Sequence, residues 1–349
     1  MTDASFRIIA PYLHDQALQT LCFADENLLT SAADLQPGSQ LLIISNRFDV
    51  YSACKAQGLN AEFSDYDCSR LPPASFDRIV YRVSKEKPVV HYLINLALGL
   101  LKVDAELILA GEKGDGIKTY ADKAGKLFGT KAAAQKHGNS YLARIRKTSG
   151  AGSGTALDDR DYETARVIAE LDGQPVVSKP GLFGWDKIDA GSEFLVTVAA
   201  DYLAANQMQP GSLLDLGCGY GYLTLCSAGW SSLRERWATD NNAAAIHCAQ
   251  LNADAFGLPV NLSADDCGAR IQSQFDLILC NPPFHQGFSV DAALTEKFLR
   301  HSRQRLSRGG VALFVVNQFI PLERLATRHY SGVEQLASNG KFKVLALRP

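Results

Sequence analysis

The chain is poor in long hydrophobic runs and carries no strong excess of either charge. No stretch of about 18 apolar residues is free of charged side chains, so we expect no membrane-spanning helix. The first residues lack the basic segment followed by an apolar core that marks a signal peptide. The formal net charge is −2, which argues against a protein that coats nucleic acid by bulk charge. We expect a cytoplasmic protein without membrane contacts.

Metal-ligand and disulfide patterns are also missing. The eight cysteines form no Cys-x-x-Cys pair, and none stands beside a histidine at ligand spacing. The pattern predicts neither a zinc site nor a disulfide framework. We expect reduced thiols and no bound metal.

What the chain does have is an ordinary globular composition, with 46% hydrophobic and 21% charged residues. Its 349 residues predict two domains. A Gly/Ser run at 148–154 is typical of a flexible linker. We therefore predict a first domain over 1–147, a linker over 148–157 and a second domain over 158–349, in a monomeric protein.

The two domains resemble copies of one another. Three short, β-rich apolar runs of the first domain recur in the second in the same order, and the pairs are 37–44 with 210–216, 76–80 with 275–279, and 103–110 with 310–316. Helical segments such as 89–101 and 292–306 lie between the runs. Alternating strands and helices predict two tandem doubly wound α/β domains related by duplication. Before the second core, two extended runs joined by Asp172-Gly173 predict a β-hairpin at about 164–178.

The copies differ where a site would lie. After the run that we match to the first strand, the first copy reads Ser45-Asn-Arg-Phe-Asp49, without glycine. The second reads Asp215-Leu-Gly-Cys-Gly-Tyr-Gly221. We expect the second domain to be catalytic. The first would be a copy without a cofactor site that serves structural support or RNA recognition.

The glycine loop predicts a nucleotide-like cofactor, because Gly217 and Gly219 let the backbone approach a ligand at the carboxyl end of a strand. The dinucleotide fingerprint requires a glycine where this chain has Tyr222. Asp215 inside the motif is unfavourable beside a pyrophosphate but suits a cofactor with a cationic amino-acid end. S-adenosylmethionine is such a cofactor. Acidic residues at the next two strand ends fit the same ligand: Asp240 for the ribose hydroxyls, and Asp265 or Asp266 for the adenine amine, of which we favour Asp266.

The segment Asn281-Pro-Pro-Phe284 follows the fourth strand. Its prolines hold the chain extended and remove two backbone donors. The Asn281 side-chain oxygen and the Pro282 carbonyl remain as acceptors for one exocyclic amine, and Phe284 offers a face on which a base can stack. This arrangement predicts methyl transfer to a planar amine.

With these motifs the chain resembles the class I S-adenosylmethionine-dependent methyltransferases, and more narrowly the bacterial small-subunit (16S) ribosomal RNA guanine-N2 methyltransferases. The matching segments are Lys85-Glu-Lys-Pro88, Gly111-Glu112, Leu182-Phe183, Asp189-Ala-Gly-Ser192, Asp215-Leu-Gly-Cys-Gly219, Asn281-Pro-Pro-Phe-His285, Asn317-Gln-Phe-Ile-Pro321 and Gly340-Lys-Phe-Lys-Val344. The resemblance implies a duplicated architecture in which only the second domain binds cofactor. It also implies that Asp189 and Ser192 close over the methionine end of the cofactor.

Several further residues are candidates for substrate contact. Residues 113–147 hold nine lysines and arginines against two aspartates, and such a basic region favours RNA docking. His285, Phe319, Lys341 and Phe342 are candidates for the edge of the base pocket. Three alternatives stay open: a guanine-N2 methyltransferase of large-subunit (23S) RNA, whose family shares the Asn-Pro-Pro-Phe-His-Gln stretch, an adenine-N6 or glutamine-N5 methyltransferase, and a non-catalytic ribosome-assembly factor.

Overall fold

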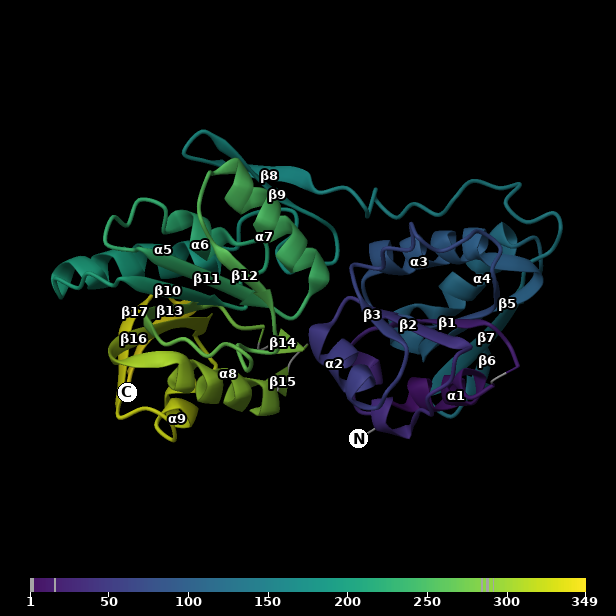
Figure 1. Cartoon of the computed structure of the whole chain (residues 1–349), viewed down its shortest axis with the longest axis horizontal. Helices are drawn as coiled ribbons and strands as arrows, with labels where there is room; N and C mark the ends of the chain where they lie inside the picture. Colours follow the sequence, from purple (N-terminus) through teal and green to yellow (C-terminus); the bar gives the residue numbers. More distant parts are fainter. Residues whose placement is uncertain (1–2, 16, 284, 287–288, 291) are drawn as a thin grey trace. The chain divides into compact units, whose positions relative to one another are not determined.

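A computed structural model describes residues 3–15, 17–283, 285–286, 289–290 and 292–349. The chain divides into two compact units, Met1–Thr164 and Ala165–Pro349, which we call the first and the second unit (Figure 1). Each unit holds one seven-stranded sheet with helices on both of its faces. The predicted fold class, two tandem doubly wound α/β domains, is confirmed.

The sheet of the first unit has the order β3-β2-β1-β4-β5-β7-β6. Its strands are β1 (Thr20–Ala24), β2 (Leu41–Ser45), β3 (Ala61–Phe63), β4 (Phe76–Arg82), β5 (Leu101–Glu112), β6 (Gln135–His137) and β7 (Ser140–Arg146). The first five strands are parallel, and β7 and β6 run antiparallel at one edge.

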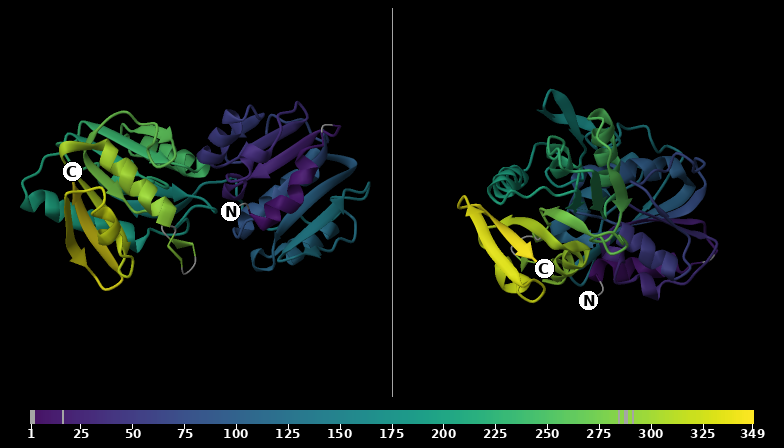
Figure 2. Two further views of the ribbon diagram at one scale, coloured as in Figure 1. Left: turned by 90° about the horizontal axis from the view of Figure 1, so that it is seen from below. Right: turned by 60° about the vertical axis from the view of Figure 1, so that its left-hand side comes forward.

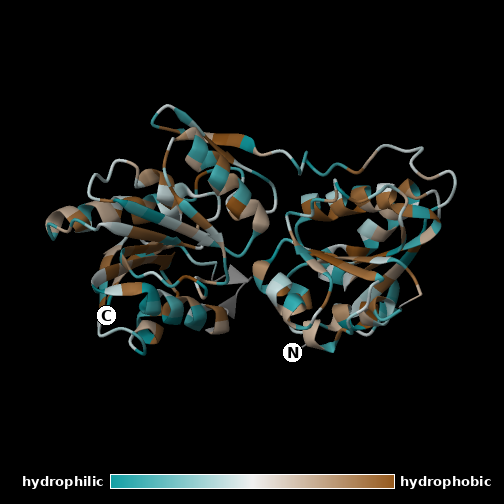
Figure 3. Cartoon of the chain, in the orientation of Figure 1, coloured by the Kyte–Doolittle hydropathy of each residue, from teal (hydrophilic) through white to brown (hydrophobic). Residues whose placement is uncertain are grey.

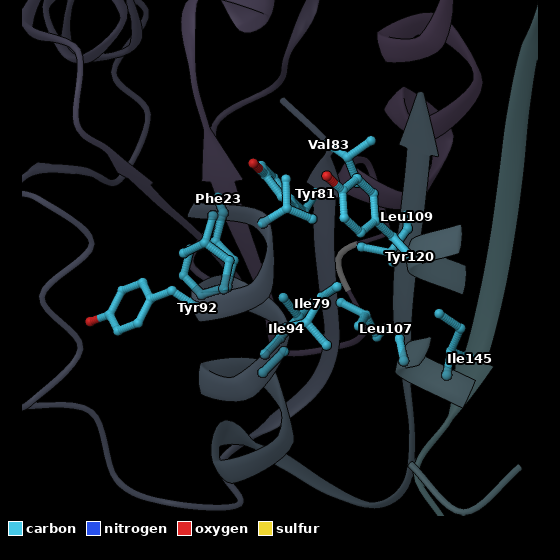
Figure 4. Close-up of a cluster of buried hydrophobic side chains, with 14 of the residues drawn as sticks. Phe23, Ile79, Tyr81, Val83, Tyr92, Ile94, Leu107, Leu109, Tyr120 and Ile145 are labelled. Atoms are coloured by element: carbon cyan, nitrogen blue, oxygen red, sulfur yellow. The ribbon is translucent and has the colours of Figure 1, made fainter. Parts of the chain in front are cut away.

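Helices cover both faces of this sheet because its central strands are apolar on both sides. On one face pack α1 (Ala4–Leu13) and α2 (Phe48–Ala56). On the other pack α3 (Lys87–Leu100) and α4 (Ile117–Leu127). Figure 4 shows part of the second layer, where Ile94 of α3 lies by Ile79 and Tyr120 of α4 lies by Leu109. In Figure 3 hydrophobic residues follow the strands of both sheets.

The sheet of the second unit has the order β12-β11-β10-β13-β16-β18-β17. Its strands are β10 (Ser212–Leu216), β11 (Glu235–Asp240), β12 (Asn261–Ala264), β13 (Phe275–Cys280), β16 (Leu306–Asn317), β17 (Gly332–Ser338) and β18 (Phe342–Arg348). Figure 2 shows this sheet from two further directions, with the antiparallel strands β17 and β18 at its edge in yellow.

The helices of the second unit again form two layers. α5 (Ala190–Ala205), α6 (Tyr222–Cys226) and α7 (Ala243–Ala255) cover one face. α8 (Ala292–Arg305) and α9 (Leu322–Ala326) cover the other. A hairpin of β8 (Arg166–Leu171) and β9 (Gln174–Ser178) packs on α7, and a second short hairpin joins β14 (His285–Gln286) to β15 (Ser289–Val290).

The two sheets follow the same strand order, which is the strongest sign of the duplication. One of the three sequence pairings is wrong, however. Residues 37–44 lead into β2, the second strand from the edge, whereas 210–216 lead into β10, the third strand from the edge. The counterpart of β10 is β1, and the counterpart of the glycine loop is the segment that begins at Ala24. Both runs follow a Pro-Gly-Ser turn and are buried on both faces, so their composition does not distinguish one parallel strand from its neighbour.

The expected linker is partly built into the first unit, which extends to Thr164. The amide of Gly152 donates to the Leu127 carbonyl. Farther along, Asn95 of α3 donates to the Leu157 carbonyl, and Tyr162 is only 1% exposed. The segment between 158 and 164 therefore belongs to the first unit, where it contributes Tyr162 to the core.

The described residues contain neither a candidate membrane span nor a candidate metal cluster. No helix in this part of the chain has the length and apolarity needed to cross a membrane. No group of three or more His, Cys, Asp or Glu side chains among these residues is placed to hold a metal ion.

Candidate functional site

The candidate site lies at the carboxyl ends of β10, β11, β12 and β13. In the parallel pair of β10 and β13, Asp215 stands opposite Leu279, so the glycine loop that follows β10 lies beside Asn281, which follows β13. β11 and β12 bring Asp240 and the 265–266 pair to the same edge. Ligands of open α/β sheets bind in this position, where the strand order reverses.

The loop after β10 needs its glycines. Gly217, Gly219 and Gly221 all have positive φ, at 80°, 54° and 90°, in a region that residues with a Cβ rarely adopt. A Cβ added at Gly219 would meet no atom within 4 Å, so its backbone is open to close approach by a ligand. The loop then leads directly into α6.

Asp215 is fully buried beneath this loop. Its Oδ2 accepts hydrogen bonds from the Thr224 amide at 3.0 Å and the Thr224 hydroxyl at 2.7 Å, while no described group donates to its buried Oδ1. Burial raises the pKa of the Asp215 carboxyl to about 7 against the effect of the Thr224 hydrogen bonds, and the Asp240 charge adds to the rise. A buried carboxylate oxygen without a donor fits a cationic group of a ligand, as the ammonium end of S-adenosylmethionine would provide.

Asp240 binds the loop from the side. Its Oδ2 accepts from the Gly219 amide at 2.9 Å, and its Oδ1 accepts from the Asn242 amide at 2.8 Å. Each carboxylate oxygen has a further lone pair. The partly exposed Asp240 can therefore accept from neighbouring hydroxyls of a ribose without leaving the loop.

The two adjacent acidic residues at the end of β12, Asp265 and Asp266, differ in burial and in their partners. Asp265 is fully buried, and its oxygens accept from the amides of Asp266 and Arg270, which makes it a structural residue. Asp266 is partly exposed and forms an ion pair with Lys297 of α8. Of the two, only Asp266 presents its carboxylate toward solvent.

The turn after β13 is described as far as Pro283. Asn281 is half-buried, and Pro282 is buried. Phe284 lies outside the described residues. His285 begins β14, and only its backbone pairing with Val290 is described.

Asn281 contacts the start of α5. Its Nδ2 donates to Asp189 Oδ2 at 2.8 Å and to Ser192 Oγ at 2.8 Å. Asp189 is also the N-cap of α5, because the same Oδ2 accepts from the Ser192 amide at 2.9 Å. Two residues predicted at the cofactor and one predicted at the base are thus in direct contact.

A second set of predicted residues gathers beside this contact. Phe342 pairs with Asn317 across β18 and β16, and the Gln318 amide donates to the Lys341 carbonyl. A Cβ added at Gly191 would lie 3.2 Å from the Phe342 ring. The Lys341 ammonium lies 5.0 Å from the centroid of the same ring, and Phe319 is 88% exposed.

The equivalent place in the first unit is filled by its own side chains. By strand register Cys22 takes the position of Asp215, Ser45 that of Asp240, and Arg82 that of Asn281. Tyr66, with φ 57°, corresponds to Cys267, with φ 56°.

These replacements close the carboxyl edge of the first sheet. The buried Tyr66 hydroxyl lies within hydrogen-bonding distance of two acceptors, the Ala24 carbonyl at 3.3 Å and Asn46 Oδ1 at 3.1 Å. Its ring packs edge-on against Phe23, which also contacts Tyr81 (Figure 4). The Arg82 guanidinium pairs with Asp3 and Asp115.

The sequence does not single out three residues that support the candidate site of the second unit: Thr224, Lys297 and Asn252. Thr224 holds Asp215, and Lys297 neutralises Asp266. The fully buried Asn252 donates to the Tyr220 and Val177 carbonyls and accepts from the Val177 amide, which joins the glycine loop to β9. None belongs to a local motif, so only the packing of α6, α7 and α8 reveals them.

Two family models match the chain. The model described as "Methyltransferase small domain" matches residues 173–346, and "Methyltransferase small domain N-terminal" matches residues 17–151. Each falls within one of the two structural units.

Curated relatives align along most of their length. A protein of Shewanella loihica named ribosomal RNA small subunit methyltransferase C is 27% identical over 92% of this chain and 91% of its own. A protein of Actinobacillus succinogenes with the same name is 29% identical over 81% of this chain and 82% of its own. Among solved structures, a T. thermophilus 16S rRNA N2 methyltransferase in complex with AdoMet and guanosine has the same fold, with a TM-score of 0.82 and 21% identity over 99% of this chain and 92% of that one.

Proposed function

The chain belongs to the methyltransferase small-domain family, in the branch of the small-subunit ribosomal RNA methyltransferases C, and we propose that it transfers a methyl group from S-adenosylmethionine to the exocyclic N2 amine of a guanine in 16S ribosomal RNA. The observation that carries the proposal is the juxtaposition of the glycine loop, with its buried Asp215, and the Asn281 turn at one sheet edge.

The proposed cofactor site combines the loop residues with the acidic strand ends. Asp215 balances the ammonium, Gly217 and Gly219 admit the backbone-facing side of the ligand, Asp240 accepts from the ribose, and Asp266 accepts from the adenine amine. Asp189 and Ser192 complete the site at its methionine end. When bound, S-adenosylmethionine supplies an activated methyl group on its sulfonium sulfur.

The proposed catalytic role of the Asn281 turn is positioning. The Asn281 Oδ1 and the Pro282 carbonyl accept from the two N–H groups of the guanine amine, which directs its lone pair toward the methyl carbon. Phe284 stacks on the base, and His285, Phe319, Lys341 and Phe342 border it. With S-adenosylmethionine bound, its sulfonium would supply the methyl group and keep the electron pair of the methyl–sulfur bond, and the amine aligned by Asn281 would lose one proton to solvent. No strong base is required, because methylation makes the amine acidic.

The substrate arrives within a large RNA, so the base must leave its stack to reach this edge. We propose that the small ribosomal subunit presents it, that the first unit supports this docking, and that the enzyme is a cytoplasmic monomer. The exposed Phe319 and the Lys341–Phe342 pair are suited to an unstacked base and its phosphates.

The test supplies labelled S-adenosylmethionine to the protein with unmodified small subunits, large subunits and their free RNAs, followed by nucleoside analysis. We expect N2-methylguanosine from small-subunit samples. Label in large-subunit RNA would show that the substrate is 23S RNA. N6-methyladenosine would show that the methylated base is adenine rather than guanine. Labelled protein glutamine would show that the substrate is a protein rather than RNA. Cofactor binding without any labelled product would leave only a role as a non-catalytic assembly factor.

Asn281→Ala tests the site itself. We expect the rate of transfer to fall by at least about 100-fold, because the acceptor that aligns the amine is removed. The dissociation constant of S-adenosylmethionine, measured by calorimetry, should stay within about threefold of the parent, since the substitution leaves Asp215 and Asp240 in place. Turnover above about a tenth of the parent would contradict the role of Asn281.

A further inference from the structure

The Asn281 amide has two ends with opposite properties. Its NH2 group donates two hydrogen bonds, and its oxygen only accepts. An amide rotated by 180° would turn the NH2 group toward the incoming amine, where donor would face donor. Methyl transfer therefore needs one of two nearly isosteric orientations, and a residue that selects it contributes to the reaction.

The structure contains such a selecting contact. Asp189 Oδ2 accepts from Asn281 Nδ2 at 2.8 Å, and Ser192 Oγ accepts from the same nitrogen at 2.8 Å. Both N–H bonds of the amide are then committed. The end of Asn281 that remains for an incoming amine is Oδ1.

The two partners of Asn281 are not equivalent. An ionised carboxylate only accepts, so turning the amide would place the Asn281 oxygen against the Asp189 oxygen, acceptor against acceptor. The Ser192 hydroxyl accepts or donates and adapts to either orientation. Asp189 therefore sets the orientation, and Ser192 reinforces it.

The contact is held rigidly on the Asp189 side. The same Oδ2 caps α5 through the Ser192 amide at 2.9 Å, which fixes the carboxylate by a second hydrogen bond. A Cβ at Gly191 would lie 2.9 Å from this oxygen and 3.2 Å from Phe342, so the glycine permits the close packing around the cap. The first turn of α5 thereby connects the cofactor side of the site to the base side.

From this geometry we propose that Asp189 is a positioning residue for methyl transfer, which orients the Asn281 amide with Oδ1 toward the substrate amine, in addition to any contact with the cofactor. The inference rests on the proposed function. It distinguishes Asp189 from a residue that only caps α5 or only binds the cofactor.

Asp189→Ser separates these roles. Serine is about as good an N-cap as aspartate, so α5 keeps its first turn, but its shorter side chain does not reach Asn281. We expect the single-turnover rate, measured at saturating S-adenosylmethionine and RNA, to fall about 10- to 100-fold, the value of one charge-assisted hydrogen bond. Ser192→Ala, which keeps the backbone amide, should lower it by less than about tenfold, because the Ser192 hydroxyl does not select the orientation.

A double-mutant cycle supplies the decisive readout. In an Asn281→Ala background, Asp189→Ser should produce no further loss, because Asp189 acts through the amide that is already absent. An equal further loss in that background would overturn the proposal, and so would a Asp189→Ser variant whose rate returns to that of the parent once the cofactor is saturating.

An activity-independent measurement complements the cycle. In the parent the side-chain NH2 signal of Asn281, assigned by its absence in Asn281→Ala, should be protected from hydrogen exchange. Asp189→Ser should reduce this protection, because only the hydrogen bond to Ser192 then remains. Unprotected exchange in the parent would refute the contact. If the parent methylates no RNA, the proposed function fails, whereas an active parent with a fully active Asp189→Ser variant rejects only the positioning role.

Discussion

Asp215 illustrates how one side chain links the fold to the chemistry. Its position in a central strand excludes water, and its two hydrogen bonds from Thr224 fix one oxygen while the other is left without a described donor. Burial raises the pKa of this carboxyl to about 7. The acid in the glycine motif is recognisable in the sequence, but its raised pKa follows from the helix packed over it.

This pKa predicts a pH-dependent affinity for S-adenosylmethionine. Below pH 7 the Asp215 carboxyl holds a proton in the free protein, and a cationic ligand nearby favours the ionised form. Binding should therefore strengthen as the pH rises from about 5.5 to 7.5, and it should release a proton near neutrality, seen as a calorimetric enthalpy that varies with the ionisation enthalpy of the buffer.

Asp215→Asn is the matched control for this prediction. The asparagine side chain keeps the shape of aspartate and an oxygen that accepts from Thr224, but it has no group that titrates in this pH range. We expect weaker binding with a flat pH profile across the same range. A parent protein whose dissociation constant and proton release do not change with pH would show that Asp215 does not face the cation.

Secondary-structure elements hold the site through contacts that no local motif announces. The hairpin of β8 and β9 is predictable from its Asp172-Gly173 turn, but its attachment is not. Asn252, in the last turn of α7, joins Val177 of β9 to Tyr220 of the glycine loop through three hydrogen bonds. In the sequence this asparagine is one polar residue in a helix.

Asn252→Leu should loosen this junction. The leucine fills the space but removes the partner of the Val177 amide, of the Val177 carbonyl and of the buried Tyr220 carbonyl, which costs about 2–4 kcal/mol in stability. We expect a lower melting temperature and faster hydrogen exchange at the Val177 amide. Gln250→Leu, on the exposed side of the same helix, is the control and should change stability by less than about 0.5 kcal/mol. Equal exchange rates in the two variants would exclude the role of Asn252.

Across the full length of the chain, the two duplicated units differ at the equivalent sheet edge. The second unit holds the candidate site there, and in the first unit side chains fill the same place. In the first unit Arg82 occupies the position of Asn281, and Tyr66 fills the space beside the segment that follows β1. The basic region of the first unit is also smaller than its composition implies. Arg144 and Arg146 pair with Glu106 and Asp104, and the Lys147 ammonium donates to backbone carbonyls.

Three of the other exposed lysines in this region predict the salt dependence of RNA binding. Lys113, Lys131 and Lys136 are exposed, and no described residue forms an ion pair with them. Replacing all three by alanine should reduce the slope of log affinity against log salt by about 2–3, if each contacts a phosphate. Filter binding to small-subunit RNA measures the slope.

The control for these lysines changes the net charge equally. Lys126, Arg144 and Arg146 are already paired with Asp122, Glu106 and Asp104, so their replacement should alter the slope less. The same slope for both triple variants would indicate that the total charge, rather than these three lysines, governs docking.

The sequence alone predicts the α/β class, the duplication, the glycine loop and the Asn-Pro-Pro turn, because these features depend on local backbone chemistry and on apolar periodicity. The strand order in the first unit does not follow, since buried parallel strands have interchangeable compositions. For that reason the pairing of 37–44 with 210–216 is wrong. The contact of Asn281 with Asp189, the pairing of Asp266 with Lys297 and the closing of the first site by Tyr66 join residues far apart in sequence. Only packing brings such residues within hydrogen-bonding distance, so tertiary structure determines how the predicted groups are oriented for chemistry.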